Sequence, residues 1–67
     1  MYLEIYGFDG TRYLFAFNSI VYISSDDVFV NVLYRDENLN VNQFSVKTPE
    51  KNYARGIVRN FYNRKKD

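Results

Sequence analysis

The stretch TPEKNYARGIVRNFYNRKK, residues 48–66, predicts a helix at the end of the chain. Thr48 can cap free backbone N–H groups, Pro49 suits the first helical position, and Glu50 complements the positive end of the helix dipole. Apolar side chains then recur at helical spacing on one face, namely Tyr53, Ala54, Ile57, Val58, Phe61 and Tyr62. We therefore expect a helix over about residues 49–65 that packs this face against the rest of the protein.

The preceding residues, 2–46, have the pattern of short strands rich in Tyr, Phe and Val. Asp9-Gly10 is typical of a tight hairpin turn, and the polar run from Ser24 to Asp27 indicates a second turn. The predicted strands are 2–8, 11–17, 20–23, 28–34 and 41–46. In the last strand the apolar alternation slips, which predicts a β-bulge near Asn42-Gln43.

Together these elements predict an α+β fold for a single domain covering residues 1–67. We expect an antiparallel four- or five-stranded β-meander or small half-barrel, with one C-terminal helix packed on one face.

A chain of 67 residues buries only about 60% of the surface that its unfolded form exposes, so its stability is marginal. Disulfides are excluded because there is no Cys. Aromatic packing and self-association remain, and we expect a homo-oligomer, most simply a dimer.

The composition argues against an enzyme, since His and Cys, the commonest general base and the best nucleophile, are both missing. We expect no catalytic residues, no metal, no cofactor and no small-molecule substrate. The acidic pairs Asp26/Asp27 and Asp36/Glu37 are typical of solvated turns.

The absence of Cys fits a reducing compartment, and no apolar run is long enough to span a bilayer, so a cytoplasmic protein without a membrane partner is expected.

Charge is distributed unevenly along the chain. Residues 1–46 carry two basic and six acidic residues, net −4, whereas residues 47–67 carry seven basic and two acidic residues, net +5. The candidate binding residues on the basic helix face are Lys51, Arg55, Arg59, Arg64, Lys65 and Lys66. They could contact phosphate or an acidic partner, or they could form a solvated face whose cations favour the C-terminal end of the helix dipole. The net charge of only +1 is low for a dedicated nucleic-acid binder.

Aromatic residues on the first predicted hairpin form a second candidate surface. They are Tyr2, Tyr6, Tyr13, Phe15 and Phe17. Exposed aromatic side chains on a sheet can stack on nucleic-acid bases, but such a face more often belongs to a core or to a subunit interface.

This chain resembles two families, the first over about residues 3–48 and the second over most of its length. Residues 20–32, IVYISSDDVFVNV, resemble the I-x-Y-I-x-S and Y/F-V-x-V core strands of LytTR-type DNA-binding domains, with Gly10 to Phe17 as the preceding strand. The LytTR resemblance implies DNA binding, but the H-R-S-type segment that contacts DNA in that family is not present here. The chain is also similar to the small flagellar FlbD-like family, with its strand meander, an I-x-x-I step at Ile20 and Ile23, and a basic C-terminal helix.

The leading functional hypothesis is a small non-catalytic interaction or regulatory protein that binds another protein. The alternative is a small nucleic-acid-binding transcriptional regulator that uses the basic helix on phosphate. The abundance of Asn, Tyr, Phe, Ile and Lys is typical of an AT-rich genome and hints at a phage or mobile-element origin.

Overall fold

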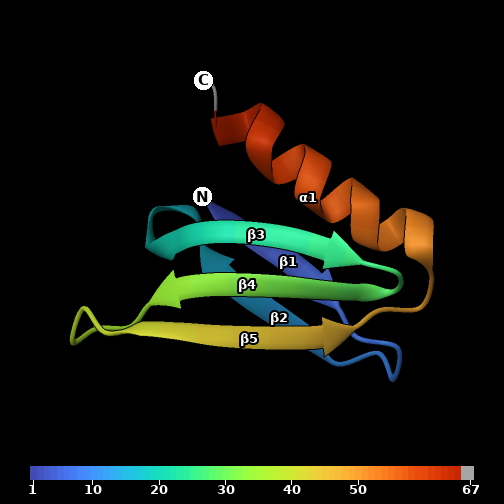
Figure 1. The fold of residues 1–67 in the computed structure, drawn as a ribbon, viewed down its shortest axis with the longest axis horizontal. Coiled ribbons are helices and arrows are strands. Elements are labelled where there is room, and N and C mark those ends of the chain that lie inside the picture. The colour runs from blue at the N-terminus through green and yellow to red at the C-terminus, as the bar shows by residue number, and fades with distance from the viewer. Residues whose placement is uncertain (66–67) are drawn as a thin grey trace.

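The computed structural model describes residues 1–65 and confirms the α+β class. Five antiparallel strands and one C-terminal helix follow one another along the chain (Figure 1). The elements are β1 Tyr2–Tyr6, β2 Arg12–Ala16, a 3-10 turn Phe17–Ser19, β3 Ile20–Asp26, β4 Phe29–Arg35, β5 Val41–Lys47 and α1 Lys51–Lys65. The strands form two sheets, a β1–β2 hairpin and a β3–β4–β5 meander.

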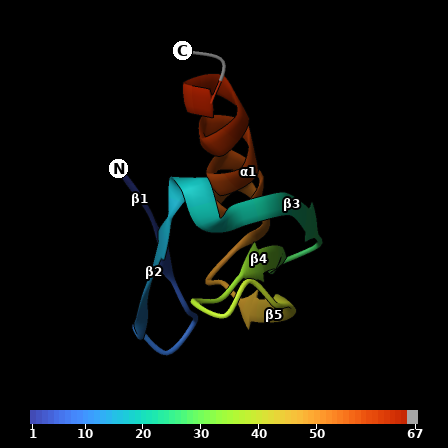
Figure 2. The ribbon, with the colours of Figure 1, turned by 90° about the vertical axis from the view of Figure 1, so that its left-hand side faces the viewer.

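The 3-10 turn separates the two sheets by changing the direction of the chain after β2. The Ser19 hydroxyl donates a hydrogen bond to the Ala16 carbonyl across this turn, at 2.8 Å. Figure 2 shows the hairpin on one side, the β3–β4–β5 sheet on the other and α1 above them. The inward-facing side chains of all three layers therefore meet in one core.

The core combines aliphatic side chains from both sheets with the apolar face of α1. Its buried members are Leu3, Ile5, Ile20, Ile23, Val30, Val32, Val46, Ala54, Ile57 and Phe61. Phe61 is fully buried and contacts Phe17, with ring centroids 5.0 Å apart. On the side away from the helix, Phe44 contacts Tyr13 and Phe15 at 5.0 and 5.8 Å. Aromatic rings thus close the gap that the helix does not cover.

The helix begins two residues later than the sequence predicts, and Thr48 is not its cap. Thr48 is buried, and both its N–H and its hydroxyl donate to the Val28 carbonyl, so this side chain extends the β4–β5 pairing. Glu50 caps the helix instead, because its carboxylate accepts the N–H of Tyr53 at 2.6 Å and its carbonyl accepts that of Ala54. Pro49 lies before the first helical residue.

The predicted bulge in β5 is wrong, because β4 and β5 pair without a register shift from Phe29–Lys47 to Arg35–Val41. The apolar side chains of Leu39 and Val41 that caused the apparent slip are simply exposed. The irregularity lies in β3, between Ile20 and Tyr22, where it lets both Ile20 and Ile23 face the core.

The predicted turn at Ser24 to Asp27 is also displaced. Strand β3 continues to Asp26, which pairs with Phe29, so only Asp27 and Val28 connect the two strands. Asp27 has a positive φ of 53°, a conformation that Asp tolerates better than most residues.

Candidate interaction surfaces

One face of the β3–β4–β5 sheet is covered by neither the hairpin nor the helix. We call it the outer face, and it consists of Tyr22, Ser24, Phe29, Asn31, Leu33, Val41, Gln43 and Ser45. These residues alternate along each strand with the buried ones, as the pleat requires. Several are large and apolar, and Tyr22, Phe29 and Val41 are 57%, 42% and 52% exposed.

Strand register places the outer-face side chains in rows across the three strands. Tyr22 lies opposite Leu33, which lies opposite Gln43. The next row holds Ser24, Asn31 and Ser45, and the Ser45 hydroxyl donates to the Asn31 side-chain oxygen. The first row is therefore apolar at Tyr22 and Leu33 and ends in the polar Gln43, and the row beside it is polar and uncharged.

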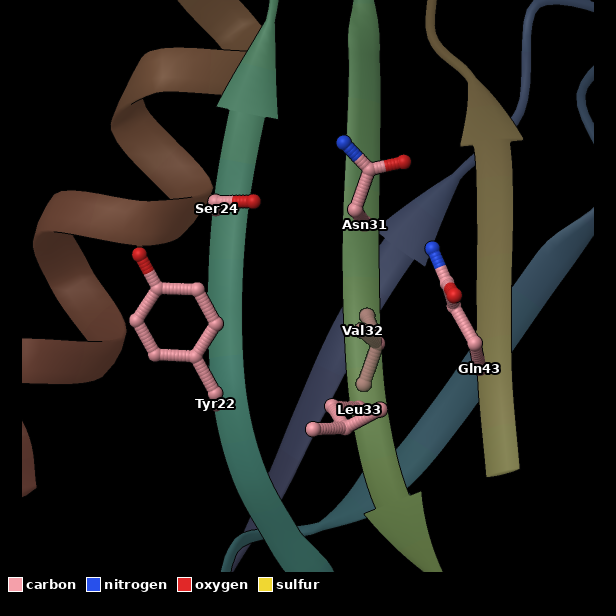
Figure 3. A pocket seen from close by; sticks show the side chains of 6 residues that line it. All are labelled: Tyr22, Ser24, Asn31, Val32, Leu33 and Gln43. Atoms are coloured by element: carbon pink, nitrogen blue, oxygen red, sulfur yellow. The ribbon is translucent and has the colours of Figure 1, made fainter. Parts of the chain in front are cut away.

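A shallow hollow of about 270 Å³ lies between these two rows (Figure 3). Tyr22 and Leu33 form its apolar side, and Ser24, Asn31 and Gln43 supply hydrogen-bonding groups around it. Val32 contributes to its floor. A hollow open along a sheet face suits one projecting side chain of a partner better than an enclosed small molecule.

The basic helix face is exposed as the sequence predicts, and Lys51, Arg55 and Arg59 lie on it. Arg12 and Glu4, on the β1–β2 hairpin, make the single ion pair found within residues 1–65. The three helix cations therefore have no carboxylate at salt-bridge distance in this part of the chain.

The remaining predicted basic residues differ in their surroundings. Arg64 lines a separate hollow with Tyr2 and Glu4, and the Lys65 ammonium lies 5.6 Å from the centre of the Phe61 ring. Lys66 lies outside the described residues. The structure thus groups Lys51, Arg55 and Arg59 on one face and places Arg64 and Lys65 at the helix end.

The structure separates the five hairpin aromatics into two groups. Tyr13, Phe15 and Phe17 point inward, and Phe15 contacts Tyr34 with ring centroids 5.3 Å apart. Only Tyr2 and Tyr6 are exposed. The inward group is part of the core, so it is not available as a stacking surface.

Two acidic turn residues, Asp36 and Asp9, accept hydrogen bonds within their own turns. The Asn42 side-chain amide, followed by the Asn40 N–H, lowers the pKa of the Asp36 carboxyl. The backbone N–H of Thr11 likewise lowers the pKa of Asp9. Within residues 1–65 no group of three His, Cys, Asp or Glu side chains is placed to hold a metal ion.

Sequence reasoning missed the outer face as a candidate site. The signal was present in β4, where Val30 and Val32 alternate with Phe29, Asn31 and Leu33. Because both sets contain large apolar residues, the alternation did not show which set would be exposed. That depended on the hairpin covering one face only.

Comparison with protein-family models, curated proteins and solved structures finds no match to this chain. The resemblance to the FlbD-like family and to LytTR-type domains therefore stays a prediction. Within residues 1–65, no helix is both long and apolar enough to cross a membrane.

Proposed function

We propose that this protein is a non-catalytic interaction module that binds another protein through the outer face and associates with itself. The observation that supports this most is the exposure of Tyr22, Phe29 and Val41 on one uncovered sheet face. Aromatic side chains are enriched where protein surfaces meet, and several large apolar side chains exposed on one sheet face are typical of an interaction site.

The chemistry of the outer face limits the kind of partner. No charged residue belongs to its two central rows, while Asp26, Arg35 and Lys47 lie at its ends. A partner would place an aliphatic or aromatic side chain over Tyr22 and Leu33. Its neighbouring polar groups would bond to Ser24, Asn31 or Gln43. The partner surface is therefore expected to be neutral at its centre.

The experiment measures the affinity of two double-substitution variants for a partner protein that has been recovered from the native cell and purified. Tyr22→Ser with Leu33→Thr removes two apolar side chains that line the hollow of the outer face, while Arg55→Gln with Arg59→Gln removes charge from the helix. The first pair is expected to weaken binding about thirtyfold, as central anchors at interfaces do, and the second to leave it within about threefold.

Circular dichroism and thermal melting of both variants show whether each is folded. Equal affinity of the folded outer-face variant and the wild type would contradict the proposal. If only the helix variant lost affinity, the binding surface would be the basic helix face.

A second candidate function, nucleic-acid binding, is favoured by one observation. Lys51, Arg55 and Arg59 repeat on the exposed side of α1 with no acidic partner within residues 1–65. Three unpaired cations along a helix can contact successive phosphates. This function predicts binding to duplex or single-stranded DNA at about 50 mM salt, weakening steeply as salt rises and in Arg55→Ala/Arg59→Ala. An absence of binding at that salt concentration would exclude it.

A further inference from the structure

We infer that two copies of this protein join through β5, whose free edges pair antiparallel with Gln43 opposite Gln43. This inference rests on the self-association proposed above and names where it occurs. The joined strands would make one six-stranded sheet, because each copy supplies β3, β4 and β5.

The free edge of β5 follows from its pairing with β4. Along a strand of an antiparallel pair, the backbone N–H and C=O groups of successive residues point alternately toward the partner strand and away from it. The Asp36 N–H donates to the Asn40 carbonyl, and the Thr48 N–H donates to the Val28 carbonyl. The backbone groups of the even-numbered residues from 40 to 48 therefore point toward β4. The N–H and C=O groups of Val41, Gln43 and Ser45 therefore point away from β4. No hydrogen bond within residues 1–65 uses them.

Specific contacts occupy parts of the β1 and β3 edges, and the edge strand β2 carries the charged residue Arg12. The Tyr53 hydroxyl accepts the Tyr6 N–H on β1, and the Tyr62 hydroxyl bonds both the N–H and the C=O of Ile23 on β3. Phe8 N–H donates to the Lys47 carbonyl at the end of β5. These contacts leave the stretch from Val41 to Ser45 as an uncovered edge in β5.

The free edge also lacks the features that prevent strands from pairing. Residues 41–46, Val-Asn-Gln-Phe-Ser-Val, contain no charge and no proline, and their register with β4 is regular. Edges that must remain single usually carry a charge, a proline or a bulge. The composition of β5 therefore favours the addition of another strand.

A second copy fits this edge because the edge is complementary to itself. With Gln43 at the two-fold axis, Val41 of each copy faces Ser45 of the other, and all three pairs place backbone donors opposite acceptors. The same arrangement brings Lys47 of one copy near the turn that carries Asp36 and Glu37 of the other. Opposite charges thus meet at both ends of the joined strands. The outer faces of the two copies lie on the same side of the sheet.

Charge substitution at the two-fold axis tests both the edge and its register. Gln43→Lys and Gln43→Glu each place like charges directly opposite, whereas an equimolar mixture of the two variants places opposite charges there. Analytical ultracentrifugation is expected to show dimers about fivefold weaker for each variant alone. The mixture is expected to return at least to wild-type affinity. Ser24→Lys, on the outer face of β3, is the control and should dimerise normally.

A backbone variant provides an independent readout. Gln43→Pro removes an N–H that faces away from β4, so the fold keeps its internal hydrogen bonds while the joined edge loses two. Dimerisation should weaken about thirtyfold, with the melting temperature of the monomer little changed.

The possible failures of these tests are distinguishable. Dimers that are insensitive to both kinds of Gln43 variant would overturn the β5 interface and leave self-association intact. Dimers lost in Tyr2→Ser/Tyr6→Ser would place the interface on the hairpin. A monomer at millimolar concentration would overturn self-association itself, without bearing on partner binding by the outer face.

Discussion

Leu39 occupies a backbone conformation that suits glycine or asparagine, with φ of 66°. It ends the three-residue loop between Asp36 and Asn40, which the Leu39 N–H closes by donating to the Asp36 carbonyl at 2.9 Å. Hairpin loops of three residues commonly end in a left-handed residue. The Leu39 side chain is exposed, so it makes little packing contact that could offset the backbone strain.

Leu39→Gly is therefore expected to raise the free energy of unfolding by about 1 kcal/mol. Asn38→Gly is the matched control, because Asn38 has no positive φ and should lose stability on the same change. Urea denaturation of both variants checks the prediction. A loss of stability in Leu39→Gly would contradict the turn conformation.

Asp36 holds the same turn together through its carboxylate, which accepts the N–H groups of Asn38 and Asn40 and the side-chain amide of Asn42. These bonds lower its pKa, with the Asn42 amide as the largest cause. A carboxyl whose pKa is lowered by folding stabilises the protein above its unfolded pKa. It loses that contribution as the pH falls through the lower, folded value.

Thermal stability should accordingly fall as the pH drops below about 4. Asp36→Asn retains an oxygen acceptor but does not titrate, so its melting temperature should fall less steeply between pH 5 and pH 2. Melting curves across that range measure the difference. Parallel pH profiles for the variant and the wild type would show that the Asp36 bonds contribute little.

At the scale of elements, α1 is joined to the strands by tyrosine hydroxyls as well as by its apolar face. Tyr62 accepts the Ile23 N–H and donates to the Ile23 carbonyl, at 3.2 and 3.0 Å, as a neighbouring strand would. Tyr53 accepts a single N–H, that of Tyr6, at 2.8 Å. The helix therefore bonds to one edge strand of each sheet, β1 and β3.

Tyr62→Phe should cost about 1–2 kcal/mol, because two bonds to a half-buried strand edge are lost, whereas Tyr53→Phe should cost about 0.5–1 kcal/mol. Both changes retain the ring, so packing is matched between them. Chemical denaturation of the pair measures the difference. A larger loss in Tyr53→Phe than in Tyr62→Phe would contradict the described docking of the helix.

The elements differ in how well the sequence predicted them, for physical reasons. The helix was predictable because Ala54, Ile57 and Phe61 repeat at its own period and face the core. The bulge near Asn42-Gln43 was wrongly predicted because Val41 is apolar, which indicated that it would be buried. In the fold its side chain is exposed. The division into two sheets depends on long-range pairing that no local pattern specifies. The basic helix face was visible in the sequence, while the outer face required knowledge of what covers each sheet.

At the scale of the whole molecule, the two sheets and the helix enclose one small core. Within residues 1–65 they leave one face of the β3–β4–β5 sheet and the free edge of β5 uncovered. The helix lies over one side of the space between the sheets (Figure 2). On the other side, Phe44 contacts Tyr13 and Phe15. The outer face and the free edge of β5 lie next to each other on the same sheet. Pairing two β5 edges would therefore double the area available to a partner while adding no new element.

Amide hydrogen exchange along β5, measured in dilute and in concentrated solution, tests this account most directly. In dilute solution the amides of Asn42, Phe44 and Val46 should exchange slowly because they bond to β4, while those of Gln43 and Ser45 exchange fast. In concentrated solution the Gln43 and Ser45 amides should become protected as well. Protection of Gln43 in dilute monomer, or fast exchange of Gln43 in a sample shown to be dimeric, would contradict the account.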